Sequence, residues 1–513
     1  MSYVVCILII PIQEYYFYVS KLISKFKYTK YLPDMDQKIF NEYFKQVPHL
    51  KKITFTLGLL ICTFVFTFTQ TTYYIDPTYS GSDSDGSKDK PYTDFPYEES
   101  HVAIVVPDNT TFLLKGGTTI KANKRYSFTG NYLTFATYGN GRATIHFPTE
   151  FTSRLFRVDG KENRIENINL ITDNRDLCPG GEADPRQSTV LSFQTGDGAG
   201  YLKNIFIQGG FRGVAAGNSP VIEGKLFIDN VDIDYVQHDG YYITHLDSLV
   251  VKNSEVTKCN ISWQYSWGGD CLQIGEVPQI VVDNCIFDHS TYPGKFAIIT
   301  TGYKLAVISN CVLKSLYFNE GGACIYPGGN SLLDENGDVD HSFKSTWEIS
   351  NCLLDGGRFC VQNRCLQFNA TNCIFTGAYE CGLDGGNAAN VVNCNFSNMP
   401  KGISMWTMDT HNIKNNIFYN IDYPVSGNLL YGNNNLYYNK DVEFDERWKS
   451  AVGNDIIIAD PLFVDAVNND FRIQENSPCI DSGDNTVGLN YDYYNLKRPL
   501  GEGIDIGAIE FIF

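Results

Sequence analysis

The chain of 513 residues is 43% hydrophobic and 19% charged, so it is too apolar for a disordered protein and long enough to bury a large core. Its 58 acidic and 40 basic side chains give a net charge of −18, which disfavours nucleic acids and other polyanions as partners. Aromatic residues make up 14% of the chain, a bias that suits β structure.

Residues 1–51 form an N-terminal extension, and residues 52–70 hold the apolar run ITFTLGLLICTFVFTF. This run is long for the core of a signal peptide and short for a membrane span, so it predicts either a cleaved signal or an uncleaved anchor. Lys51 and Lys52 precede it and place the residues after 70 outside. We therefore expect an extracellular or cell-surface protein that is exported, or tethered to the membrane, through this segment.

A short pattern recurs in the region from 151 to 440, with alternating apolar and polar residues, an Asn, and apolar residues again, as in IVVDNCIF, AVISNCVL and WEISNCLL. The Asn residues at positions 351, 372, 393 and 415 are 21, 21 and 22 residues apart. Alternation with period 2 predicts short strands, and Asn tolerates the left-handed backbone of a sharp bend. A propeller needs units of about 40 or more residues, so the spacing contradicts it. The pattern therefore predicts an all-β solenoid whose stacked Asn side chains form a ladder.

The spacing is wider in two places, with 26 residues from Asn284 to Asn310 and 41 from Asn310 to Asn351. Such gaps indicate loops inserted into otherwise regular coils. Repeat proteins commonly place their binding surface on such insertions.

The chain has 15 cysteines, and five of them directly follow the repeated Asn, at positions 285, 311, 352, 373 and 394. One repeated interior position predicts stacked free thiols that pack as small hydrophobic groups. Neighbours in such a stack are about 4.8 Å apart, so an occasional disulfide remains an open alternative.

These Asn-bounded coils resemble the right-handed parallel β-helix proteins of the pectate-lyase-like superfamily. The resemblance implies a single-stranded β-helix of about ten coils with terminal caps, preceded at 71–150 by a cap and the first strands. The segment around Tyr73-Tyr74-Ile75-Asp76-Pro77 is similar to the entry segment of bacterial β-helix proteins. Residues 441–513, with Ser477-Pro478-Cys479 and Asp505-Ile506-Gly507, resemble the choice-of-anchor Q domain, which implies a C-terminal module that closes the other end.

A functional site in a solenoid takes the form of a column of polar residues, because equivalent positions in successive coils lie about 5 Å apart. One such column precedes the strand after each loop, and its members are Arg212, Asp239, Asp270, Lys295, Arg358, Glu380 and Lys401. Asp239, Asp270 and Lys295 fall in three adjacent coils. Two carboxylates at this separation repel unless a cation or a proton lies between them, which predicts a Ca²⁺ site or an acid pair.

The column resembles that of the uronate-cleaving β-helix lyases. In that family Ca²⁺ or cationic side chains neutralise the substrate carboxylate, a Lys or Arg takes the C5 proton, and the glycosidic oxygen leaves by β-elimination. The roles implied here are metal or substrate binding for Asp239 and Asp270, the base for Lys295, and positioning or acid roles for Gln273, His289 and Arg358.

A glycoside hydrolase is the second enzymatic alternative. The segment Gly268-Gly269-Asp270-Cys271 resembles the G-D-D-C segment of polygalacturonases, and Asp239-Gly240 resembles their N-T-D-G segment. An inverting hydrolase needs two carboxyl groups about 6.5 to 9.5 Å apart, and Asp239 with Asp270 would supply them.

Aromatic side chains near the column are candidates for stacking on sugar rings, and the alternative for them is burial under a loop. They are Trp263, Tyr265 and Trp267 before Asp270, and Tyr242 after Asp239. His238, His245 and His289 have no ligand spacing such as H-E-x-x-H, so the sequence predicts no zinc site.

Taken together, the sequence predicts a monomeric bacterial cell-envelope protein that acts on polysaccharide, by lyase chemistry with Ca²⁺ as cofactor. The alternative from another class is a non-catalytic carbohydrate-binding or adhesive surface protein, because one fold hosts both functions.

Overall fold

The computed structural model describes residues 70–97, 103–148, 153–173, 188–259, 269–291, 295–316, 321–329, 345–407, 411–427, 430–453 and 455–512. The extension and nearly all of the apolar segment expected to direct export lie outside these ranges. Within them, no helix is long and apolar enough to span a membrane.

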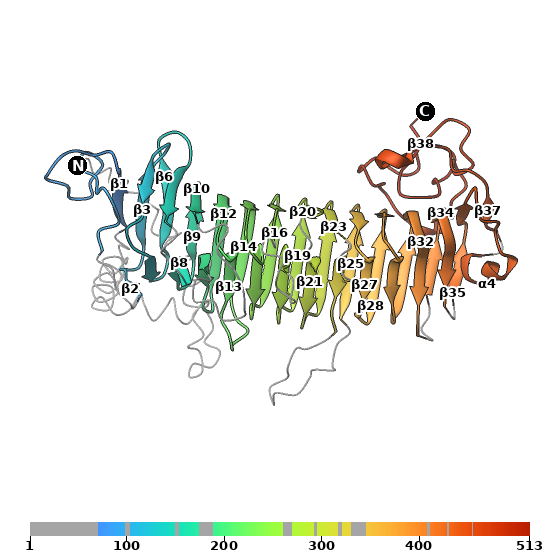
Figure 1. Cartoon of the computed structure of the whole chain (residues 1–513), viewed down its shortest axis with the longest axis horizontal. Helices are drawn as coiled ribbons and strands as arrows, with labels where there is room; N and C mark the ends of the chain where they lie inside the picture. Colours follow the sequence, from blue (N-terminus) through green and yellow to red (C-terminus); the bar gives the residue numbers. More distant parts are fainter. Residues whose placement is uncertain are drawn as a thin grey trace, which may run out of the picture. The chain divides into compact units, whose positions relative to one another are not determined.

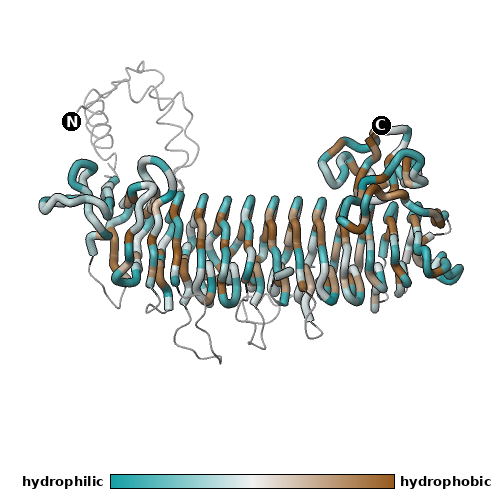
Figure 2. Tube along the Cα trace, turned by 45° about the horizontal axis from the view of Figure 1, so that its top comes forward, coloured by the Kyte–Doolittle hydropathy of each residue, from teal (hydrophilic) through white to brown (hydrophobic). Residues whose placement is uncertain are grey.

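Strands β1 to β37 form one hydrogen-bonded sheet wound into a right-handed parallel β-helix, as the coil repeat predicts (Figure 1). Each complete coil contributes strands to three stacks, and every pairing between coils is parallel. Hydrophobic residues recur at the same places in successive coils (Figure 2).

Stack 1 follows the Asn bend of each coil. It contains β4 (Thr119–Lys121), β7 (Ala143–Phe147), β10 (Ile168–Thr172), β12 (Ala199–Gln208), β14 (Lys225–Asp234), β17 (Glu255–Thr257), β20 (Ile286–His289), β23 (Val312–Ser315), β26 (Leu353–Gly356), β29 (Ile374–Thr376), β32 (Asn395–Met405), β34 (Ile417–Ser426), β36 (Leu436–Tyr438) and β37 (Ile457–Ile458).

Stack 2 comes next in each coil. It contains β2 (Ile104–Val105), β5 (Tyr126–Thr129), β8 (Ser153–Asp159), β11 (Ser188–Gln194), β13 (Arg212–Gly217), β15 (Tyr241–Thr244), β18 (Leu272–Gly275), β21 (Phe296–Thr301), β24 (Ala323–Pro327), β27 (Phe359–Asn363), β30 (Cys381–Gly385) and the second halves of β32 and β34.

Stack 3 leads back to the Asn. It contains β1 (Thr71–Ile75), β3 (Thr110–Lys115), β6 (Thr134–Tyr138), β9 (Asn163–Glu166), the first halves of β12 and β14, β16 (Ser248–Lys252), β19 (Gln279–Asp283), β22 (Leu305–Ser309), β25 (Thr346–Ser350), β28 (Gln367–Thr371), β31 (Ala388–Val392), β33 (His411–Lys414) and β35 (Leu430–Asn433). The solenoid has more than the predicted ten or so coils. The additional coils come from the N-terminal region, because the strands from Thr71 onward already belong to stack 3.

The predicted Asn ladder is present. The repeated Asn residues adopt left-handed backbone, with φ of 52° at Asn284 and 53° at Asn351. Neighbouring amides hydrogen-bond, for example Asn415 Nδ2 to Asn393 Oδ1 at 3.0 Å and Asn284 Nδ2 to Asn253 Oδ1 at 2.7 Å. The ladder therefore satisfies side-chain amides at the same corner where the backbone turns.

The cysteines that follow the ladder are buried free thiols, as expected. Each points its sulfur to the carbonyl two residues earlier, as in Cys311 Sγ to Ser309 O at 3.0 Å. Apolar side chains fill the rest of the interior in matching files. The rings of Phe375, Phe396 and Phe418 stack with centroids 4.5 and 5.3 Å apart.

The C-terminal region has two parts. The first contains η1 (Glu446–Trp448) and α4 (Lys449–Val452), and it covers the last coil, where Asn435 Nδ2 donates to the Val452 carbonyl at 2.6 Å. The second, residues 455–512, folds back over the ladder flank of earlier coils (Figure 1). It holds β38 (Phe463–Asp465), η2 (Ala466–Asn468), β39 (Asp470–Ile473) and η3 (Asn485–Val487).

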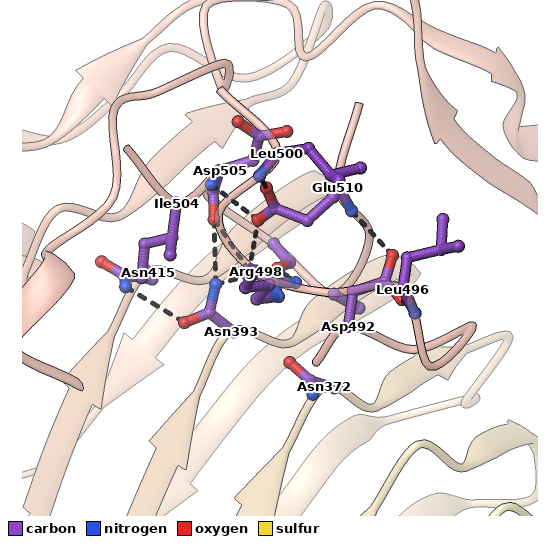
Figure 3. A network of polar contacts seen from close by, with 12 residues as sticks. Asn372, Asn393, Asn415, Asp492, Leu496, Arg498, Leu500, Ile504, Asp505 and Glu510 are labelled. Carbon is purple, nitrogen blue, oxygen red and sulfur yellow. Dashed lines mark hydrogen bonds and ion pairs between the residues drawn. The ribbon is translucent and has the colours of Figure 1, made fainter. Parts of the chain in front are cut away.

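A buried arginine holds this second part together (Figure 3). Arg498 Nη1 lies 3.1 Å from Glu510 Oε1 and donates to the Asp505 carbonyl at 3.1 Å, while Nη2 donates to the Gly507 carbonyl at 2.8 Å. The same two carbonyls accept from Asn393 of the ladder, at 2.9 and 3.0 Å. Residues 441–513 were expected to close the end of the solenoid. Only the part that contains η1 and α4 covers the last coil, whereas residues 455–512 lie against the Asn ladder of earlier coils.

Candidate functional site

Asp239 and Asp270 occupy equivalent positions of adjacent coils, as predicted, because Tyr241 pairs with Leu272. Both are buried, at 0% and 4% exposure. Asp239 Oδ2 accepts a hydrogen bond from Arg212 Nε at 2.9 Å, and Oδ1 accepts from the Asp270 N–H at 3.2 Å. Asp270 Oδ1 in turn accepts from the Phe296 N–H at 2.9 Å. Each of the two carboxyl groups therefore hydrogen-bonds the backbone of the following coil.

The pKa values of the two carboxyl groups shift in opposite directions. Burial opposes ionisation of Asp239, but the contact with the His238 imidazole, 2.9 Å away, and the charge of Arg212 outweigh it and lower its pKa. Burial first, and then the negative charge of Asp239, raise the pKa of Asp270 well above its ordinary value. Opposite shifts of this kind are typical of an acid pair, in which the carboxyl group with the raised pKa holds its proton to a higher pH than its partner does.

The expectation that Lys295 continues this file is wrong by one residue. Leu272 pairs with Ile298, so Asp270 aligns with Phe296 and Lys295 aligns with Gly269. Lys295 is exposed, with Nζ 5.8 Å from the Phe296 ring centroid, whereas Phe296 is buried in a small apolar cluster with Ala323 and Phe359 that is separate from the main core. The two aspartates and the lysine therefore do not form one cluster.

The outer side of stack 2 carries a row of half-buried side chains in register. Pairing runs from Tyr242 to Gln273 and then to Ile299 and Tyr326, and continues from Gln362 to Asp384. The structure thus brings the predicted binding residues Tyr242 and Gln273 side by side. We call the outward row from Tyr242 to Asp384, with the cations at its edge, the stack 2 face.

Cationic side chains lie along the edge where the strands of this face begin. The Arg212 guanidinium lies over the Tyr242 ring, 4.2 Å from its centroid, and is held there by Asp239. Arg358 Nε is 2.8 Å from Glu380 Oε2 in the next coil. Lys295 shares the row of Arg358, since Ala323 pairs with both Phe296 and Phe359.

Trp406 is a member of this face that the sequence did not single out. Its ring is 54% exposed, its Nε1 donates to Asp384 Oδ1 at 3.1 Å, and the Arg364 guanidinium lies 4.3 Å from its ring centroid. Burial raises the pKa of Asp384 more than the Trp406 hydrogen bond lowers it. The only feature of the sequence that pointed toward Trp406 is Lys401, which lies five residues before it in the segment PKGISMW and belongs to the predicted column.

His289 does not reach the stack 2 face. It ends β20 with its ring in the interior, where Cys259 Sγ lies 3.3 Å from Nε2 and 3.5 Å from Nδ1. Cys259 Sγ is also 3.2 Å from Cys271 Sγ. The sequence did not pair Cys259 and Cys271 with His289, because neither cysteine follows the repeated Asn and no ligand spacing links them to the histidine.

The remaining predicted aromatic residues, Trp263, Tyr265 and Trp267, lie outside the described residues. Their place relative to the face stays a prediction.

No protein-family model and no curated protein matches the sequence. Among solved structures, the chain is similar to pectate lyase Pel9A at 16% identity and a TM-score of 0.44, over 86% of this chain and 97% of that one. It is similar to a rhamnogalacturonan lyase at 13% and 0.35, over 64% and 82%. A GH136 lacto-N-biosidase from Eubacterium ramulus gives 10% and 0.40, over 77% and 70%. At such low identities and TM-scores the likeness carries no argument about function.

Proposed function

We propose that the stack 2 face binds a polysaccharide that carries carboxylate groups and that the protein cleaves it by β-elimination. One observation carries the proposal: half-buried Tyr and Gln side chains recur along one outward row, and the half-buried Arg212 and Arg358 and the exposed Lys295 lie at its edge. Aromatic rings suit the apolar faces of sugars, and cations suit uronate carboxylates. A polymer lying along the solenoid axis would meet a new row of contacts about every 4.8 Å.

The proposed chemistry assigns one role to each kind of side chain. Arg212 and Arg358 lie five coils apart and hold the carboxylates of different uronates along the polymer. At a uronate between them, Lys295 takes the C5 proton, the C4–O bond breaks as the double bond forms, and the leaving oxygen takes up a proton from water. Arg212 is well placed because Asp239 and Tyr242 fix its guanidinium before any substrate arrives.

Calcium assistance stays a proposal, and Asp239 and Asp270 do not fit as its ligands. Asp239 already faces Arg212 and His238, and both carboxyl groups accept backbone N–H donors. Ca²⁺ takes six to eight oxygen ligands in a flexible site. No step is therefore routed through a metal ion.

The test incubates the full-length chain with a panel of uronate polysaccharides, with Ca²⁺ or with a chelator, and follows the absorbance of unsaturated products. Lys295→Ala should remove turnover by at least about 100-fold, the contribution of a general base. Lys304→Ala is the matched control, since it replaces a lysine away from the stack 2 face. If the wild-type chain releases no unsaturated product from any polymer while it still binds one, the face is a binding surface and the lyase proposal fails.

Hydrolysis is the second candidate, and Asp384 favours it, because a carboxyl group with a raised pKa under a tryptophan suits a general acid. A reducing-end assay without unsaturated product, abolished by Asp384→Asn but not by Lys295→Ala, would select this candidate. Export, a membrane tether through residues 52–70 and a choice-of-anchor Q module at the C-terminus belong to the same proposal of a cell-envelope protein.

A further inference from the structure

We propose that Cys259, Cys271 and His289 form a binding site for one zinc ion in the interior of the solenoid. One ligand atom from each of the three lies within 4.8 Å of the others. The side chains are 0%, 0% and 1% exposed, so no solvent competes for their ligand atoms. This site is independent of the stack 2 face and of any activity there.

The distances match a coordination shell more closely than a packed core. The sulfurs are 3.2 Å apart, and Cys259 Sγ is 3.3 Å from His289 Nε2. Zinc binds thiolate sulfur at about 2.3 Å and imidazole nitrogen at about 2.0 to 2.1 Å, so ligands of one ion come within a few ångströms of each other. The shift needed to admit the ion is therefore small.

The chemical types of the ligands select the metal. Two thiolates and an imidazole are the soft and borderline donors that zinc prefers, whereas Ca²⁺ and Mg²⁺ take oxygen. Two thiolates also balance the charge of a divalent ion, which removes the cost of burying an isolated charge.

The other interior thiols show what a bare packing position looks like. Cys352 and Cys373 point their sulfurs to backbone carbonyls two residues earlier, at 3.2 and 3.3 Å. Neither has a histidine next to its sulfur among the described residues. The cluster is thus a local departure from the repeated thiol file, and the imidazole is what distinguishes it.

The location suggests what the ion would do. Cys259 and Cys271 lie near the two ends of the stretch 258–271, which joins β17 of stack 1 to β18 of stack 2. His289 ends β20 in the following coil. An ion held by all three would fix both ends of that stretch to the next coil.

The experiment measures bound metal on the full-length, reduced chain after equilibration with Zn²⁺ and removal of the excess. The expected result is one zinc ion per chain in the wild type and its loss in the Cys259→Ser/Cys271→Ser variant. Removing a group behind a metal ligand already weakens binding by about 10- to 100-fold, and removing two ligands should exceed that. Cys352→Ser/Cys373→Ser is the matched control and should keep the ion.

A second measurement on the wild type needs no variant. With Co²⁺ in place of Zn²⁺, bound thiolates should give a sulfur-to-cobalt charge-transfer band in the near ultraviolet. The proposal is overturned if the wild type holds no more metal than the Cys259→Ser/Cys271→Ser variant, or if the band is missing. It is also overturned if peptide mapping shows a Cys259–Cys271 disulfide in protein kept reduced with Zn²⁺.

Discussion

Replacement of Arg498 by Met should detach the C-terminal segment from the ladder. The Arg498 and Glu510 side chains are 0% and 1% exposed and lie 3.1 Å apart. Met fills much of the same space but removes the charge, the ion pair and the hydrogen bonds to the Asp505 and Gly507 carbonyls. Glu510 is then left as a buried charge without its cation, which costs about 3–5 kcal/mol of folding free energy.

Arg472→Met is the matched control, because Arg472 pairs with Asp470 at 2.5 Å on the surface, with 58% of the arginine side chain exposed. An exposed pair contributes only about 0–1 kcal/mol. Urea unfolding gives the free energy of each variant, and hydrogen exchange at the Gly507 amide, which donates to the Asn415 carbonyl, reports on the docked segment. Arg498→Met should lose that protection and Arg472→Met should keep it.

The double variant Arg498→Met/Glu510→Gln separates charge burial from packing. It should recover part of the lost stability, because no unpaired charge remains. Should Arg498→Met unfold within about 1 kcal/mol of the wild type, or the double variant be no better than the single one, the buried ion pair is not what holds the segment.

Three further predictions concern stability. Hydrogen bonds from Thr486, and then from Lys414 and Asn433, lower the pKa of Asp484 to about 2. The carboxylate therefore contributes about 2 kcal/mol of folding free energy, which is present above pH 4–5 and is lost as the pH falls through about 2. In urea titrations Asp484→Asn should make stability depend less on pH between about pH 5 and 2, and an unchanged dependence would refute the prediction. Asn393→Ala removes the two hydrogen bonds to the Asp505 and Gly507 carbonyls and the one accepted from Asn415, at a left-handed position, and should cost about 3 kcal/mol, whereas the exposed Asn310→Ala should cost about 1 by the same urea assay. Phe396→Ala, between two stacked rings, should cost about 3–5 kcal/mol of unfolding free energy, and a loss under about 1 would mean that the core closes the gap.

The coil repeat could be predicted because each of its signals is local. Asn at the bend, within a run of alternating apolar and polar residues, recurs from copy to copy, and a cysteine follows it in five of them, so the ladder and the thiol file follow from one unit. The register between β18 and β21 could not be predicted in this way. A shift of one residue leaves the alternation of both strands intact, and only the pairing of Leu272 with Ile298 shows that Lys295 leaves the file.

The candidate site was predictable in its location and only partly in its members. Tyr242 and Gln273 lie at outward positions of stack 2, which alternation alone indicates. Trp406 beside Asp384, and Cys259 beside His289, depend on how adjacent coils align, and no spacing motif records that alignment. Asp239 and Asp270 are in register as expected. Their burial, with backbone N–H groups donating to both carboxyl groups, could not be predicted from the sequence.

The docking of residues 455–512 on the ladder flank has a consequence for how the chain winds. Asn393 and Asn372 offer their amides to carbonyls more than a hundred residues later in the chain. A coil that slipped by one residue would turn these amides away, and the last segment would find no donors. Residues 455–512 therefore dock fully only on a solenoid whose coils are already in the correct register.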